Sequence, residues 1–151
     1  MASPGFFELQ TAMDLLRKLE WDYTQLQQDS ENVYLAYNFF VTAENMPEWV
    51  KDKAFKHRIQ QQKLILTLVN ELATGGKHMT SGKKKPAIDS ATRDRYVAEG
   101  YVKRGYFKEP LVVRLSPEQA AKRGQDTIDV LTLAGEVLAH WQQYLQAPAS
   151  P

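Results

Sequence analysis

Apolar residues recur at helical spacing near the start of the chain. Between Phe7 and Leu26 they fall alternately three and four positions apart, at Leu9, Ala12, Leu16, Leu19, Tyr23 and Leu26. Because an α-helix has about 3.6 residues per turn, this spacing places the apolar residues on one face. The pattern therefore predicts a first amphipathic helix over 7–26.

A second helix is predicted after Asp29 and Ser30, whose side-chain oxygens can cap a first turn. Its apolar positions at helical spacing are Val33, Tyr37, Phe40 and Val41. Pro47 lacks a backbone N–H and disfavours a helical conformation for Met46. We therefore expect the chain to bend at Met46 and Pro47 and to restart a turn at 48–50.

A third helix is predicted from about Phe55 to Thr74. The apolar stripe that buries its second half consists of Ile65, Leu68, Val69 and Leu72. Gly75 suits the left-handed residue that often ends a helix, so we expect the helix to stop at Thr74. Lys77 and His78 would then follow the carbonyl end, where positive charge is favourable.

Helical periodicity is lost from Thr80 to Pro110, where glycine and proline separate short apolar runs. The following residues 111–115 alternate in a way that predicts a strand, and we expect it to pair with a segment in 96–107. Ser116 to Gln119 has the form of a capping box, and Gly124 soon follows, which predicts a short helical turn.

A last helix is predicted over 126–145. Its apolar residues form two stripes, one at Ile128, Leu131, Leu138, Trp141 and Leu145, and one at Val130, Leu133, Val137 and Tyr144. Two stripes predict burial on two sides. The flanking segments 1–6 and 147–151 lack such a pattern, and we expect both to be disordered.

These elements predict a mainly α protein: a four-helix bundle with a small antiparallel β insertion between helices 3 and 4. A chain of 151 residues suits one core. We expect a single helical domain over 7–146, with the insertion at about 80–115. Binding and catalytic residues often lie on such insertions.

Composition restricts the classes of function. Nineteen Lys and Arg residues face eighteen Asp and Glu residues, so the net charge of +1 gives no global field that would hold a polyanion. Cysteine is absent, and no apolar stretch approaches the roughly 20 residues that span a bilayer. We expect a cytoplasmic protein without a membrane partner.

Lys77 and His78 are the candidate catalytic residues. The imidazole of His78 follows two glycines and precedes an irregular segment, so it could face a crevice between helices and sheet and exchange protons near neutral pH. A structural histidine that ties the loop to the helix end is the commoner case. The glycines follow a helix instead of preceding one, which excludes a phosphate-binding loop.

The other candidate chemistry is sparse. Glu136 and His140 are four apart, a spacing that can ligate a metal, but a surface pair is commoner and no second helix offers a matching motif. No serine has the context of a nucleophile. We therefore expect no metal and no cofactor, and beyond the candidates Lys77 and His78 the sequence does not indicate catalysis.

Cations and aromatic residues in the insertion are candidate binding residues: Lys83, Lys84, Lys85, Arg95, Tyr101, Lys103 and Arg104. They could neutralise phosphates and stack bases. The alternative is a solvated lysine loop and a strand with aromatic residues turned to the helices. The aromatic residues of the second helix cannot all face one side, since successive residues are about 100° apart: Tyr34, Tyr37, Phe39 and Phe40. Some of them must meet a second surface, for which the insertion is the first choice, while Tyr34 and Phe39 make a homodimer the alternative.

The segment AYNFFVTAENMPEW, from Ala36 to Trp49, precedes a helix that ends in Gly-Gly-Lys-His, a β-rich segment and a final helix. This order resembles a group of uncharacterised bacterial and phage proteins over most of residues 7–145. In that group the third helix ends in Ala-Asn-Gly-X-Lys-His-Phe. Ala73, Gly75, Lys77 and His78 match that pattern, whereas Thr74 and Met79 replace its Asn and Phe.

The arrangement is more distantly similar to HEPN-like helical domains, many of which are dimeric RNA-cutting toxins or RNA-binding modules. Their motif pairs an arginine with a histidine, and His78 would place that arginine at positions 71 to 73, which hold Glu71, Leu72 and Ala73. The leading hypothesis is a non-catalytic protein-interaction module of bacterial or phage origin. The alternative is a HEPN-like RNA-binding or RNA-processing module that uses His78 and the neighbouring lysines.

Overall fold

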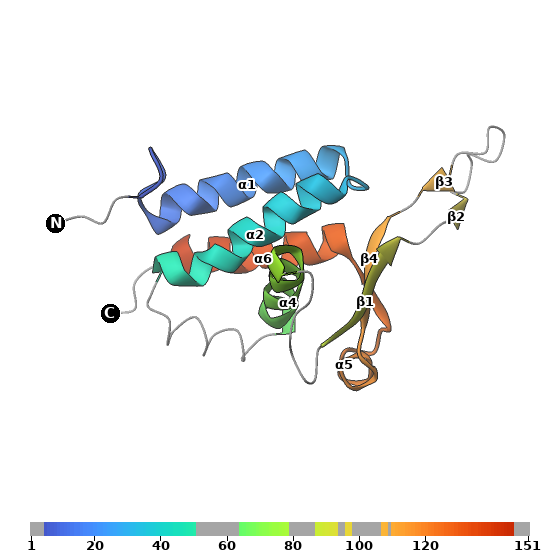
Figure 1. The fold of residues 1–151 in the computed structure, drawn as a ribbon. Coiled ribbons are helices and arrows are strands. Elements are labelled where there is room, and N and C mark those ends of the chain that lie inside the picture. The colour runs from blue at the N-terminus through green and yellow to red at the C-terminus, as the bar shows by residue number, and fades with distance from the viewer. Residues whose placement is uncertain are drawn as a thin grey trace.

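The computed structural model describes residues 5–50, 64–78, 87–93, 96–97, 107–108 and 110–146. Its helices are α1 (Ala12–Gln28), α2 (Val33–Val50), α4 (Leu64–His78), α5 (Pro117–Arg123) and α6 (Val130–Gln146). Its strands are β1 (Ile88–Arg93), β2 (Tyr96–Val97), β3 (Phe107–Lys108), β4 (Leu111–Leu115) and β5 (Thr127–Asp129). Figure 1 shows α1, α2, α4 and α6 at one side, and the strands with α5 at the other.

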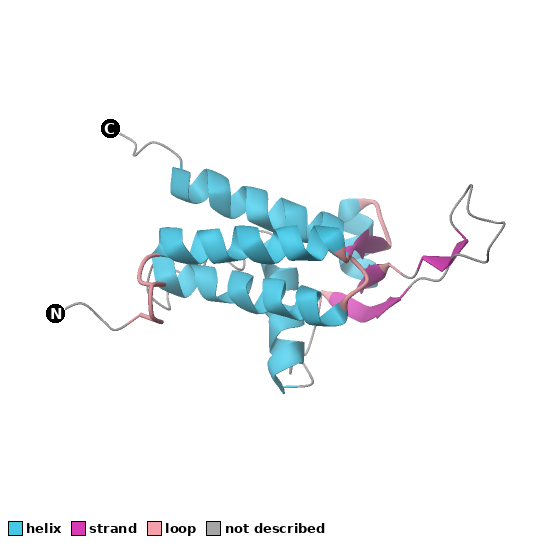
Figure 2. Cartoon of the chain, turned by 90° about the horizontal axis from the view of Figure 1, so that it is seen from above, coloured by secondary structure: helices cyan, strands magenta, loops and turns pink. Residues whose placement is uncertain are grey.

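Three long helices, α1, α2 and α6, lie side by side, and α4 crosses them at a steep angle (Figures 1 and 2). Helix α1 packs against α2 and α6, and α4 packs against α2 and α6. The mainly helical fold with a small antiparallel sheet is confirmed. The four-helix bundle is not confirmed, because α4 crosses α2 instead of lying along it.

Helix α1 begins at Ala12, not at residue 7 as the apolar spacing predicts. The Thr11 hydroxyl accepts a hydrogen bond from the Asp14 N–H at 3.1 Å, and the Asp14 carboxylate accepts one from the Thr11 N–H at 3.0 Å. This reciprocal capping box satisfies donors that a helix start leaves unpaired. Before it, Phe6 and Leu9 pair through two backbone hydrogen bonds, so the chain turns before the helix begins.

Helix α2 differs from its prediction at both ends. The Asn32 side chain, not Asp29 or Ser30, caps its start, because the Asn32 amide oxygen accepts the Tyr34 N–H at 2.9 Å. The helix then continues through Pro47 to Val50, and the predicted bend is wrong. Pro47 removes one backbone donor, but Met46 and Pro47 are both buried, and this packing holds the last turn helical.

Helix α4 continues through Gly75 and Gly76 to His78, so the predicted stop at Thr74 is wrong. Gly75 does not adopt a left-handed conformation; among the described glycines, Gly124 is the one with positive φ, at 80°. Glycine permits a helix to end but does not require it, and the buried side chains before Gly75 keep the helix in place. Residues 55–63 of this predicted helix lie outside the described part of the chain.

Strand β4 is the centre of the larger sheet, with β1 and β5 antiparallel on its two sides. The prediction that β4 pairs within 96–107 is wrong: its partner is β1, while β2 and β3 pair with each other farther from the helices (Figure 1). Strand β5 occupies the predicted start of the last helix. Ile128 is buried there, and the Asp129 carboxylate caps α6 by accepting the Thr132 N–H at 3.1 Å.

The short helix predicted after β4 is confirmed as α5. The Ser116 hydroxyl caps its first turn, Pro117 is its first residue, and the left-handed Gly124 ends it. A 3.2 Å ion pair between Arg123 and Glu136 ties α5 to α6.

One hydrophobic cluster runs through the helices and the sheet, and it includes both Leu68 of α4 and Leu138 of α6. Trp141 and Phe39 are its largest fully buried side chains. Phe39 is 0% exposed and lies against the rings of Tyr23 and Phe40. The expectation that Phe39 contributes to a dimer surface is therefore wrong, because a buried ring cannot contact a second copy.

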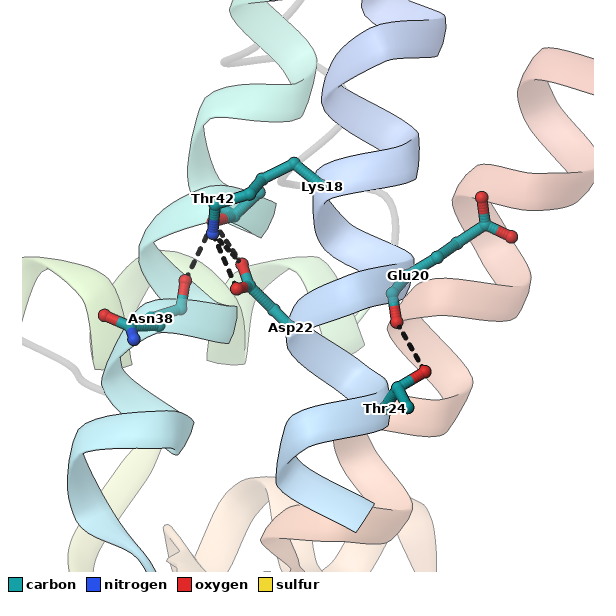
Figure 3. A network of polar contacts seen from close by, with 6 residues as sticks. All are labelled: Lys18, Glu20, Asp22, Thr24, Asn38 and Thr42. Carbon is teal, nitrogen blue, oxygen red and sulfur yellow. Dashed lines mark hydrogen bonds and ion pairs between the residues drawn. The ribbon is translucent and has the colours of Figure 1, made fainter. Parts of the chain in front are cut away.

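A buried carboxylate joins α1 to α2 (Figure 3). Asp22 is 1% exposed, and both of its oxygens lie 2.6 Å from the Lys18 ammonium. The Thr42 hydroxyl of α2 lies 2.6 Å from one Asp22 oxygen and 2.9 Å from the Asn38 carbonyl oxygen. A carboxylate in an apolar interface needs such partners, because an unpaired buried charge is costly.

Replacing Lys18 alone should therefore lower the free energy of unfolding more than replacing Lys18 and Asp22 together. Lys18→Met leaves the buried Asp22 with the Thr42 hydroxyl alone, and we expect a loss of about 2 kcal/mol in the free energy of unfolding, since Lys18 is partly hydrated. The double variant Lys18→Met with Asp22→Leu should recover most of that loss. Denaturant unfolding of the three proteins measures this, and a double variant as unstable as Lys18→Met would contradict it.

Candidate functional site

An apolar pocket of about 350 Å³ lies between α2, α4, the sheet and the start of α6. Its lining residues come from all four: Val33, Ala36, Tyr37, Phe40, Val41, Leu72, Ala73, Ala91, Leu111, Val112 and Val130. Among the described lining residues, Tyr37 supplies the single polar side-chain group, a hydroxyl. This described part of the lining is therefore suited to hydrocarbon or aromatic groups.

Helix α2 lines one wall with the apolar stripe that the sequence predicts for it. Val33 and Tyr37 remain 50% and 48% exposed, whereas Phe40, which also lines the pocket, is buried. The core contact of α2 is made by a neighbouring stripe: Ala36, Phe39, Phe40, Ala43 and Met46. The predicted stripe thus lines a surface pocket, and periodicity alone could not distinguish these two uses of an apolar face.

Glu71 of α4 fixes the position of β1 beside the pocket. Its carboxylate is buried, with the residue 4% exposed, and accepts the Ala87 N–H at 2.8 and 3.0 Å. The Ala87 carbonyl in turn accepts the Ser116 N–H at 2.8 Å, which ties the same point to the end of β4. The side-chain amide of Asn70 also donates to Glu44 of α2 at 2.8 Å. These contacts hold α4, β1 and α2 at fixed separations, so the pocket is preformed.

Aromatic and apolar side chains are exposed beside the pocket. Tyr34 is 81% exposed, one turn of α2 from the pocket-lining Tyr37. Val33, at the N-terminal end of α2, is also half exposed. Together, Val33, Tyr34 and Tyr37 make a small apolar surface that leads into the pocket.

The predicted catalytic residues lie on a helix that contributes to the pocket. Lys77 and His78 are the last two residues of α4, which lines the pocket through Leu72 and Ala73. The side chains of both cations lie outside the described residues. The same holds for the predicted binding residues, whose placement is not described: Lys83, Lys84, Lys85, Arg95, Tyr101, Lys103 and Arg104.

The three positions that would hold the arginine of a HEPN-like motif have other contacts. Glu71 binds the Ala87 backbone, and Leu72 and Ala73 line the pocket. A cation at position 71 would lose this acceptor for the β1 backbone, and one at 72 or 73 would enter an apolar wall. The local structure accounts for the residues found at these positions.

The spacing of Glu136 and His140 suggested a metal pair as an alternative to surface residues. The Glu136 carboxylate instead binds Arg123. Within the described ranges, no cluster of three or more His, Cys, Asp or Glu side chains is arranged to hold a metal ion. None of the described helices combines the length and the apolar composition that crossing a bilayer requires.

A scan against protein-family models, a search of curated proteins and a search of solved structures each found no match. The pocket is therefore interpreted from its own geometry and chemistry.

The role of Glu71 can be tested by changing its acceptor oxygens. Glu71→Leu leaves the buried Ala87 N–H without its acceptor, and we expect a loss of about 1–3 kcal/mol in the free energy of unfolding. Glu71→Gln keeps one acceptor oxygen and should lose less. Denaturant unfolding measures the stability of each variant, and hydrogen exchange at the Ala87 amide measures the protection of this N–H group. Unchanged exchange in Glu71→Leu would contradict a role for Glu71 in holding the Ala87 backbone.

Proposed function

We propose that this chain is a non-catalytic protein-interaction module, which receives an apolar side chain of its partner in the pocket between α2, α4 and the sheet. The observation that supports this most directly is an open, preformed apolar pocket with Val33, Tyr34 and Tyr37 exposed beside it. Protein interfaces concentrate their binding energy where an aromatic or aliphatic anchor fills such a pocket. The proposal includes the cytoplasmic location and the bacterial or phage origin expected from the sequence.

The size of the pocket favours a side chain over a cofactor. A volume of about 350 Å³ is near the lower end of the roughly 300–1,000 Å³ typical of ligand sites. A nucleotide or other charged cofactor would also need polar partners, and the described lining residues offer one tyrosine hydroxyl. An aliphatic or aromatic side chain needs none, and Tyr34 and Tyr37 are of the residue type enriched at interfaces.

Filling the pocket should abolish its binding of aromatic groups. We expect p-cresol and toluene, as analogues of the Tyr and Phe side chains, to shift the amide resonances of Leu72, Ala73 and Ala91 in ¹H–¹⁵N spectra. Ala73→Leu places three more carbon atoms in the pocket and should remove these shifts. Ala139→Leu makes the same change at an exposed position of α6 and should leave them intact.

We expect a protein partner to bind the native chain and the Ala139→Leu variant equally well. The Ala73→Leu variant, whose pocket is filled, should not bind this partner. Thermal unfolding of each variant verifies that Ala73→Leu is folded. Probe shifts that persist in Ala73→Leu, or that map to residues remote from the pocket, would overturn the proposal.

The alternative proposal is a HEPN-like RNA-binding or RNA-processing module. It is supported by the place of Lys77 and His78 in the last turn of α4, with three further lysines shortly after them in the sequence. It lacks the arginine that would stabilise a pentavalent phosphate.

Incubation with total RNA at low salt separates the two proposals. We expect neither cleavage nor a change in RNA mobility, because the net charge is small and the described pocket is apolar. RNA cleavage that His78→Ala abolishes would instead establish the RNA-processing function. A mobility shift that disappears when Lys83, Lys84 and Lys85 are replaced by alanine would establish RNA binding.

A further inference from the structure

The hydroxyl of Tyr37 gives the apolar pocket one point of chemical selectivity. Tyr37 lines the pocket together with Phe40, which lies one turn further along α2. The residue is 48% exposed, and within the described ranges its hydroxyl has no hydrogen-bond partner. A phenolic hydroxyl can both donate and accept a hydrogen bond. In the open pocket, this hydroxyl can therefore exchange both kinds of hydrogen bond with water.

An occupant of the pocket changes the surroundings of this hydroxyl. A group that fills the pocket displaces water from its walls, and the hydrocarbon part of the walls loses no hydrogen bond. The Tyr37 hydroxyl, in contrast, loses its water partner when a hydrocarbon group lies against it, and an unpaired polar group without water is unfavourable. An occupant with its own hydroxyl at this point restores the hydrogen bond.

The rest of the lining favours an aromatic ring. The rings of Tyr37 and Phe40 belong to the same stretch of α2, since residues three apart are neighbours on a helix. Aromatic rings attract one another in edge-to-face and offset contacts beyond the effect of the buried area. A cavity of about 150 Å³ can hold benzene, so the pocket volume of about 350 Å³ accommodates one substituted ring.

We infer that the anchor which the partner places in this pocket is a tyrosine side chain, and that the Tyr37 hydroxyl selects it. This rests on the pocket function proposed above and specifies the chemistry of the partner. A phenylalanine anchor fills the same space but leaves the Tyr37 hydroxyl unpaired. A tryptophan anchor is larger, and its indole N–H only donates. A charged anchor would bury a charge that none of the described lining residues can pair.

Two small probes that differ by one hydroxyl test this selectivity. p-Cresol carries the phenol of a tyrosine side chain, and toluene lacks the hydroxyl. Their dissociation constants can be measured by ¹H–¹⁵N titration, followed at the amides of Leu72, Ala73 and Ala91. Tyr37→Phe keeps the ring and removes the hydroxyl. We expect it to raise the dissociation constant of p-cresol about three- to tenfold, the effect of one neutral hydrogen bond, and not to raise that of toluene.

A matched control removes a tyrosine hydroxyl elsewhere. Tyr144, 37% exposed, lies near the end of α6, where its ring contacts Trp141. It is separated along α6 from Val130, which lines the pocket, by about 20 Å at a rise of about 1.5 Å per residue. Tyr144→Phe should leave both dissociation constants unchanged. Thermal unfolding of each variant verifies that it is folded.

The outcomes separate this inference from the pocket function on which it rests. If both probes bind the native chain and Tyr37→Phe weakens neither of them, or weakens both equally, the selection of tyrosine is overturned while the apolar pocket function stands. If neither probe binds the native chain, the pocket function fails and the inference fails with it. A loss of affinity for p-cresol alone, in Tyr37→Phe and not in Tyr144→Phe, is the result we expect.

Discussion

The burial of α6 on two sides holds the helices and the sheet in one structure. Leu133, Val137 and Trp141 of this helix are fully buried, and α6 contacts α1, α2, α4, β4 and β5. The helix begins directly after β5, where Asp129 ends the strand and caps the helix. Because one element contributes to both layers, the hydrophobic core is continuous, and the sheet is fixed relative to α2 and α4.

The pocket follows from the way α4 meets this framework. Helix α4 crosses α2, and Glu71 holds the start of β1 through the Ala87 backbone. A helix that lay along α2 would cover the stripe that includes Tyr37 and Val41. The crossing leaves that stripe facing the sheet across an apolar space, and the Glu71 carboxylate holds the residue before β1.

The sequence by itself determined the class of the fold and the place of several elements. The apolar periods of α1 and α6, the alternation in β4 and the cap of α5 are local signals, and each depends on residues a few positions apart. It also identified the stripe on α2 that lines the pocket. Tertiary structure alone decided that this stripe lines a pocket and that β4 pairs with β1 and β5. It also decided that α4 continues through Gly75 and that Pro47 stays helical. Each of these depends on which distant residues cover a given face, and local spacing carries no information about that. The contact between Glu71 and Ala87 is the clearest example. From the sequence, a glutamate on a helix is predicted to be exposed, and only the fold brings the Ala87 N–H to its buried carboxylate.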